Sequence, residues 1–585
     1  MGAASSRRRD LYLRSIYVAV LAAVLLVGLL GISASSNLSL RNLAAGSASV
    51  FSFLAGFQLI LICILSPVFM AGAISREANP KTWDILLTTP MSPMQIVLGN
   101  LLGRLFFIVA LSLGALPLMI VTQFFGGVPL DTILLTQIVA ICLALIIAAS
   151  AIAMSVTRTG GRKPAVGFFL VTVLYLLVTF TADQWLRVPI AAGASATWTT
   201  FLTPLNPYLV LDVLLHPSGY VVPETSSSPW PLGWAITHPV ACWCLLTSIL
   251  SFIMVCWSSL QVRSLGERQV TDGWVKRLFR NANNPREPHA VSGNPITWRE
   301  RVTRHRNIGS LVGRWGFVAI CLLTFIILTS LYATNALTPD SFRFWVLALV
   351  CSELVIITFA AISLSASAIA KEREDGSLDL LLTTSITPKM YLGGKIRGLT
   401  LHLLPIALVP CVTMMAVAVI VLIDPIGAVV SDQPIGSNST TDMPLALVAP
   451  ALLTPVVVFP YIAFCLAVGL LWSMRSKGSI SAIVTSLILV LVVTGGLGMC
   501  LVPGSSMGHI GSFIAAMSPI NAVRSTMMSV DVIPSVIKEG VQTANLSLAT
   551  ASIIAGILWS LISLGMLRSM SASFVVTVRR LAGIN

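Results

Sequence analysis

Long apolar runs, separated by short polar segments, divide this chain into elements that are long enough to cross a membrane. A helix of about 20 apolar residues spans the roughly 30 Å hydrocarbon core of a bilayer. Runs of this order lie at residues 15–34, 47–74, 98–125, 131–157, 165–182, 238–262, 315–334, 344–370, 393–423, 446–474, 479–501 and 548–570. We therefore predict an all-α polytopic membrane protein with about twelve transmembrane helices, six in each half of the chain.

One polar segment between the apolar runs occurs twice, 295 residues apart, at 76–93 and at 371–388. The residues that coincide are Glu77 with Glu372, Asp84 with Asp379, Leu87 with Leu382, Thr88 with Thr383, and Pro93 with Pro388. Inside the second apolar run of each half, Gln58 and Glu353 coincide at the same offset. The repeat predicts two six-helix halves that are related in parallel.

Each copy of this segment is predicted to form two short helices beside the membrane. In the second copy, Leu378, Leu381 and Leu382 have the i, i+3, i+4 spacing of an apolar stripe. The acidic residues around the stripe are expected to face water; they are Glu372, Glu374 and Asp379. Further along, Lys395 and Arg397 are expected to anchor the next span at the membrane interface.

The second helix of each copy has a sequence-level start signal. Thr387 and Ser92 can accept hydrogen bonds as N-caps, and each is followed by a proline, Pro388 or Pro93, at the first helical position. One helix therefore ends, and another begins, within each copy.

The second copy resembles the first cytoplasmic loop of type-2 ATP-binding-cassette permeases, which carries a similar Glu-x-x-x-Gly-x-Leu-x-x-Leu-Leu-x-Thr-x-x-x-Pro signature. The matching residues are Glu372, Gly376, Leu378, Leu381, Leu382, Thr384 and Pro388. The first copy departs from it, with Lys81 and Trp83 in place of the glycine and the first leucine. The resemblance implies a fused exporter permease whose two loops are coupling helices that dock on the ATPase.

The chain has no Gly-x-x-x-x-Gly-Lys-Ser/Thr phosphate loop, and its linker, 263–310, is too short for an ATPase domain. We therefore expect no enzyme activity and no cofactor in this chain. The resemblance implies two cytoplasmic ATPase subunits per permease, and these would bind ATP and Mg²⁺. The ten cysteines and six histidines are dispersed, so no metal site is expected.

Composition and charge place the chain in the membrane and orient it. Hydrophobic residues make up 56% of the chain and charged residues only 10%, whereas soluble proteins have about 25% charged residues. The net charge of +14 would suggest nucleic acid in a soluble protein, but ten Lys or Arg residues lie in the linker 263–310. The loop 424–445 has three Asp residues and no Lys or Arg. The positive-inside rule predicts that both termini, the linker and both signature loops lie in the cytoplasm. We therefore expect a cell-membrane protein whose partners include lipid and not nucleic acid.

These patterns divide the chain into a first permease half, 1–262, a basic linker, 263–291, and a second half, 292–585. Each half is expected to begin with an amphipathic elbow helix; in the second half Asn294 offers an N-cap and Pro295 the first helical position. The outward segments 203–206 and 518–521 coincide at an offset of 315 residues. Each is expected to open a short amphipathic stretch, 207–215 or 522–530.

Gln58 and Glu353 are expected near the middle of the membrane. An ionisable residue there costs several kcal/mol unless it faces protein or water. We expect an interhelical hydrogen bond between these two residues across the seam of the halves. A direct role of Glu353 in the transport path is the alternative.

Two other classes of protein share part of this pattern. A secondary transporter of the major-facilitator kind also has twelve spans in two parallel halves, but it would carry a Gly-x-x-x-Asp-Arg-x-Gly-Arg-Arg type of loop after its second span. The corresponding loop here is rich in Glu and Leu instead. A membrane scaffold without cargo is the third class, and co-purification of an ATPase would separate it from the exporter.

Overall fold

The structure of the protein is a computed structural model, and every structural statement below concerns the residues that it describes. These are residues 14–15, 17–26, 28–29, 40–70, 92–157, 172, 175–176, 178–180, 182–183, 186–187, 197–216, 219–221, 232–262, 294–305, 308–335, 337–374, 376, 386–425, 429–434, 440–476, 478–499, 508–533, 536–537 and 539–581.

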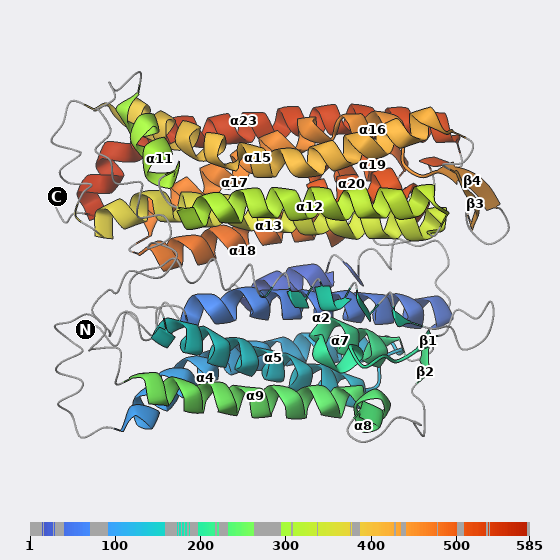
Figure 1. Ribbon diagram of the computed structural model, residues 1–585, viewed down its shortest axis with the longest axis horizontal. Helices are drawn as coiled ribbons and strands as arrows, with labels where there is room; N and C mark the ends of the chain where they lie inside the picture. Colours follow the sequence, from blue (N-terminus) through green and yellow to red (C-terminus); the bar gives the residue numbers. More distant parts are fainter. Residues whose placement is uncertain are drawn as a thin grey trace. The chain divides into compact units, whose positions relative to one another are not determined.

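The chain folds into two compact units, Met1–Glu287 and Pro288–Asn585. In the first unit four long helices pack side by side: α2 (Leu40–Met70), α4 (Pro93–Gln123), α5 (Leu130–Thr157) and α9 (Pro239–Val262). Shorter elements gather at one end of this bundle (Figure 1): η1 (Thr203–Leu205), α7 (Pro207–Leu215), α8 (Leu232–Thr237) and the parallel strands β1 (Thr197–Trp198) and β2 (Tyr220–Val221).

The second unit is a larger helical bundle. Its long helices are α12 (Ile308–Ala333), α13 (Pro339–Glu374), α15 (Pro388–Ile423), α17 (Thr454–Arg475), α18 (Ser479–Met499) and α23 (Val541–Leu581). Its shorter elements are α11 (Pro295–His305), β3 (Val429–Pro434), β4 (Thr440–Pro444), α16 (Val448–Leu452), α19 (Gly508–Met517), α20 (Pro519–Met527) and α21 (Ser529–Val532). Figure 1 shows α11 at the end of this bundle opposite to the antiparallel hairpin β3–β4.

The prediction of an all-α polytopic membrane protein is confirmed. Within the described ranges, nine helices are long and apolar enough to cross a membrane: α2, α4, α5, α9, α12, α13, α15, α17 and α23. The predicted runs 15–34 and 479–501 contain shorter apolar helices, Tyr17–Leu26 and Ser481–Gly495. Most of the run 165–182 lies outside the described residues, so the total of twelve stays a prediction.

The predicted helix starts are confirmed in atomic detail. The Ser92 side chain accepts a hydrogen bond from the backbone N–H of Gln95, and the Gln95 side chain accepts one from the N–H of Ser92. Thr387 accepts from the N–H of Met390 at the start of α15. At the start of α11, Asn294 accepts from the N–H of Ile296. These caps satisfy N–H groups that have no partner within the helix.

The first outward helix has its predicted range, 207–215, whereas the second spans Pro519–Met527 and so begins three residues before the predicted 522–530. In the first unit, Thr203 begins a 3-10 turn, and Asn206 then caps α7 by accepting from the N–H of Tyr208 at 2.9 Å. In the second unit, Pro519 itself opens α20. The helix-opening prolines, Pro207 and Pro519, are therefore 312 residues apart, because a 3-10 turn directly precedes only the first of them.

Candidate functional site

The end of α13 and the start of α15 flank the second signature segment, and most of that segment lies outside the described residues. Four predicted site residues of the second copy therefore have no structural account: Leu378, Asp379, Leu382 and Thr383. The same holds for Glu77, Asp84, Leu87 and Thr88 in the first copy. Gly376 is exposed and lies in a turn with φ of +70°, a conformation that favours glycine. Pro93 and Pro388 open α4 and α15, as predicted.

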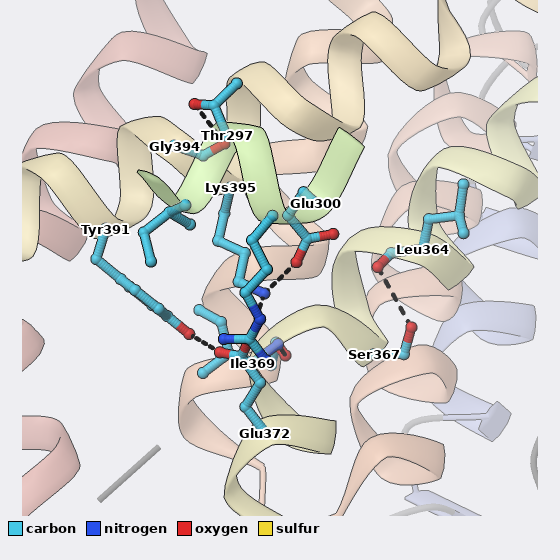
Figure 2. Close-up of polar contacts among 12 residues, drawn as sticks. Thr297, Glu300, Leu364, Ser367, Ile369, Glu372, Tyr391, Gly394 and Lys395 are labelled. Atoms are coloured by element: carbon cyan, nitrogen blue, oxygen red, sulfur yellow. Dashed lines mark hydrogen bonds and ion pairs between the residues drawn. The ribbon is translucent and has the colours of Figure 1, made fainter. Parts of the chain in front are cut away.

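A buried charge cluster surrounds Glu372 in the last turn of α13. We call Arg299, Glu300, Glu372, Tyr391 and Lys395 the charge cluster. One carboxylate oxygen of Glu372 lies 2.8 Å from the ammonium of Lys395 and 3.4 Å from the guanidinium of Arg299, and the other accepts a hydrogen bond from the Tyr391 hydroxyl. Lys395 also pairs with Glu300. Figure 2 shows the side chains of α11, α13 and α15 that make these contacts.

The prediction that Glu372 faces water is wrong, and so is the prediction that Lys395 anchors α15 at the membrane interface. Glu372 is 7% exposed and Lys395 is 2% exposed. A buried charge is tolerated only when it is paired, and here one ammonium lies between two carboxylates. Arg299 and Lys395 together balance the charges of Glu300 and Glu372, so the cluster has no net charge.

Two glycines of α15 allow the elbow helix α11 to approach closely enough to complete the cluster. A Cβ atom on Gly394 would lie 2.7 Å from the Cβ of Ile296, and one on Gly398 would lie 2.8 Å from the Cβ of Glu300. The Gly-x-x-x-Gly spacing places both glycines on one face of the helix. The Thr297 hydroxyl of α11 donates a hydrogen bond of 3.3 Å to the carbonyl of Gly394 (Figure 2).

The last turns of α13 are also attached to α17. Arg373 donates to the carbonyls of Met474 and Ser476 at the end of α17, where carbonyl groups have no partner within the helix. The hydroxyl oxygen of Ser473 accepts from the backbone N–H of Ala370 at 2.8 Å. The residues next to the signature segment are therefore tied to α11, α15 and α17 together.

The first half of the chain repeats the two glycines of α15 but has no cation at the position of Lys395. Gly99 and Gly103 on α4 stand 295 residues before Gly394 and Gly398, whereas Asn100 stands at the position of Lys395. The Asn100 amide donates to the carbonyl of Ile96 in its own helix. An amide cannot neutralise a buried carboxylate as an ammonium does, so the two halves differ chemically at this position.

Gln58 belongs to a buried polar network inside the first unit. Its amide N–H groups donate to the Ser112 hydroxyl at 2.9 Å and to the side-chain oxygen of Gln137 at 3.0 Å. The Ser112 hydroxyl donates to the same Gln137 oxygen, so the network joins α2, α4 and α5. The expected hydrogen bond between Gln58 and Glu353 stays a prediction, and the Gln58 amide already has partners in its own unit.

A second polar cluster, which the sequence did not indicate, ties together the short elements of the first unit. The buried carboxylate of Asp183 lies 2.8 Å from Arg187 and accepts from the Thr203 hydroxyl at 3.1 Å. The Arg187 guanidinium stacks over the ring of Tyr220, whose hydroxyl donates to Asp212. Burial, and then the hydrogen bond to Asp212, raise the pKa of Tyr220, so its hydroxyl keeps the proton that it donates. This cluster fixes the segment between β1 and β2.

The charge cluster was also missed at sequence level, although a signal was present. Glu300 and Lys395 are 95 residues apart, and no local spacing links them. The Gly-x-x-x-Gly pattern around Lys395 is the one feature that predicts close helix packing there. Within the described part of the chain, no group of three or more His, Cys, Asp or Glu residues could hold a metal ion.

Comparison with known proteins gives a match within the first half of the chain. Residues 15–261 match the family model described as ABC-2 family transporter protein. The matched range ends within α9, the last long helix of the first unit. No curated protein matches the chain.

Proposed function

We propose that this chain, whose residues 15–261 match the family model described as ABC-2 family transporter protein, is a membrane permease that exports its substrate with energy from separate cytoplasmic ATPase subunits. ABC-2 proteins are the membrane transport components of ABC-type transporters and are not themselves catalytic. In this proposal two ATPase subunits bind ATP and Mg²⁺, and each contacts one signature segment. The observation that supports it most is the charge cluster directly beside the second segment.

The charge cluster gives a physical route from the ATPase to the spans. A force on residues 375–387 acts on the last turn of α13, and Glu372 in that turn pairs with side chains of α11 and α15. Separating these helices would leave buried charges without partners, which is strongly unfavourable. The ends of α11, α13 and α15 therefore move as one body, and Arg373 extends that body to α17.

The partner is tested by replacing the central residues of both signature segments while leaving the charge cluster intact. Residues 82–90 and 377–385 are changed to Gly-Ser sequences of the same length in the full-length chain. We expect normal membrane insertion and loss of the co-purifying ATPase and its ATP hydrolysis. The control is the same replacement of residues 435–439 between β3 and β4, which should retain the ATPase.

Two results would contradict this proposal. One is that the doubly replaced chain still purifies with an active ATPase. The other is that the purified chain hydrolyses ATP by itself.

The proposed orientation is tested separately by cysteine labelling with a membrane-impermeant reagent. Because basic segments stay in the cytoplasm, single cysteines near residues 40, 225, 432 and 540 should react from outside. Cysteines near residues 82, 160, 280, 378 and 477 should react only after the membrane is opened. Labelling at 280 from outside would overturn the assignment of six spans to the first half.

A further inference from the structure

Glu353 is a carboxylic side chain in the interior of the second unit that the proposed coupling mechanism does not use. It lies 14 residues into α13, about 21 Å along the helix axis. The side chain is 0% exposed, and among the described residues neither carboxylate oxygen has a hydrogen-bond partner of good geometry. Buried polar groups nearly always have such partners, so this one requires a physical explanation.

The polar groups around Glu353 are one hydroxyl and several thiols. Two of them, on Thr413 and Cys411, already donate hydrogen bonds to backbone carbonyls. The Thr413 hydroxyl and the Cys321 thiol lie within reach of the carboxyl group. The Thr413 hydroxyl donates to the carbonyl of Pro410 at 3.0 Å, and the Cys411 thiol faces the carbonyl of Ala407 at 3.4 Å. On α15, Thr413 and Cys411 therefore offer lone pairs to Glu353 and not protons.

No ion pair with Glu353 occurs among the residues that the structure describes. Five helices pack against α13: α12, α15, α17, α18 and α20. The titratable groups of α12 and α15 near the carboxyl are Cys321 and Cys411, and α18 has no titratable residue. On α17, Tyr461 faces Thr358, more than one turn along α13, and on α20 the exposed Arg524 acts on Cys351. Within the described ranges, no cation compensates a negative charge at this position.

We infer that Glu353 is a proton-binding site, occupied in this conformation, so that the second unit holds a neutral carboxylic acid between α12, α13 and α15. An ionised carboxylate here would have no counter-charge among the described residues and, as a donor, only the weak S–H group of Cys321, whereas the acid O–H can donate to the Thr413 oxygen. At the repeated position in the first half, the Gln58 amide does not titrate. The chain therefore binds one proton at this pair of positions, in addition to the ATP-driven function proposed above.

The bound proton also links protonation to helix packing. Its release would leave a charge that only water or a cation can stabilise, so α12, α13 and α15 must part before Glu353 loses it. With the three helices packed as they are here, the Glu353 side chain is 0% exposed and the proposed proton stays bound.

Infrared difference spectroscopy of the purified full-length chain tests the inference. The spectrum of the wild type minus Glu353→Gln at neutral pH should show the carbonyl stretch of one protonated carboxylic acid per chain, with the downshift in D₂O that marks an exchangeable proton. The matched control is Asp340→Asn, which removes an exposed carboxylate in the first turn of the same helix. That difference spectrum should show carboxylate bands instead.

Carboxylate bands in the Glu353→Gln difference spectrum would overturn the inference and would indicate a bound cation at this site. If Glu353→Gln does not fold, the infrared spectrum of Thr413→Val tests the inference instead. This substitution removes the proposed acceptor and leaves the Glu353 carboxylic acid in place. Its carbonyl stretch should move to the higher frequency of an acid without a hydrogen bond. An unchanged acid band would contradict the donation to Thr413, and the absence of any acid band would contradict the bound proton.

Discussion

Replacing Lys395 with methionine is expected to destabilise the second unit by about 3–5 kcal/mol, the typical cost of removing one partner of a buried ion pair. Glu300 and Glu372 would then share a buried site without the ammonium that neutralises them. Arg299 cannot replace it, because its side chain is half exposed and lies 3.4 Å from Glu372. The measurement is unfolding of the purified chain in detergent micelles, followed by circular dichroism.

Lys389→Met is the matched control for this substitution. Lys389 is an exposed residue in the first turn of the same helix, so its loss should change stability by less than about 0.5 kcal/mol. A triple variant, Lys395→Met with Glu300→Gln and Glu372→Gln, should recover most of the lost stability because no buried charge is left unpaired. The charge cluster would lose its assigned role if Lys395→Met unfolded at the same point as Lys389→Met.

A leucine at Gly394 is expected to push α11 away from α15 and to destabilise their packing by about 1–3 kcal/mol. Its Cβ alone would lie 2.7 Å from the Cβ of Ile296, an atom that cannot move without the α11 backbone. The readout is disulfide cross-linking between cysteines that replace Asn294 and Met390. In the wild type the Asn294 side-chain amide donates a 2.7 Å hydrogen bond to the carbonyl of Met390. The cross-linking yield should fall sharply in Gly394→Leu.

Gly393→Leu is the control for the glycine prediction. It makes the same change one residue away, where an added Cβ meets no atom within 4 Å. Both variants gain the same helix propensity, of about 0.8–1.0 kcal/mol at most, so the difference between them isolates the collision with α11. Equal cross-linking in the two variants would show that the glycine face does not set the position of the elbow helix.

The two halves of this chain are repeated in sequence but are not equivalent in chemistry. Asn100 stands where Lys395 completes the charge cluster, and Gln58 stands where Glu353 is buried with no ion-pair partner in the described part of the chain. Both differences place the ionisable residue in the second half. We therefore expect charge substitutions in the second half to have the larger effect on stability.

The sequence alone determined the features that depend on local patterns. The nine long apolar helices found among the described residues lie where the apolar runs predicted them, because a membrane span requires only length and hydrophobicity. The N-caps Ser92, Asn294 and Thr387 were predictable because an N-cap acts on N–H groups two or three residues away. The repeat also located the segment next to the charge cluster, because residues that match at a fixed offset can be found in the sequence alone.

Only the tertiary structure decided how the charged and polar side chains are used. The sequence pattern predicted that Glu372 would be solvated beside a leucine stripe, but the residue is buried. The cause is α11, about 70 residues earlier in the chain, which packs over it because Gly394 and Gly398 of α15 allow a close approach. The environment of Glu353 depends on which atoms of α12 and α15 face it. It also depends on the hydrogen bond that the Thr413 hydroxyl donates to a carbonyl of its own helix. Pairing and burial of charges are properties of helix faces brought together by packing, and one sequence does not state which faces meet.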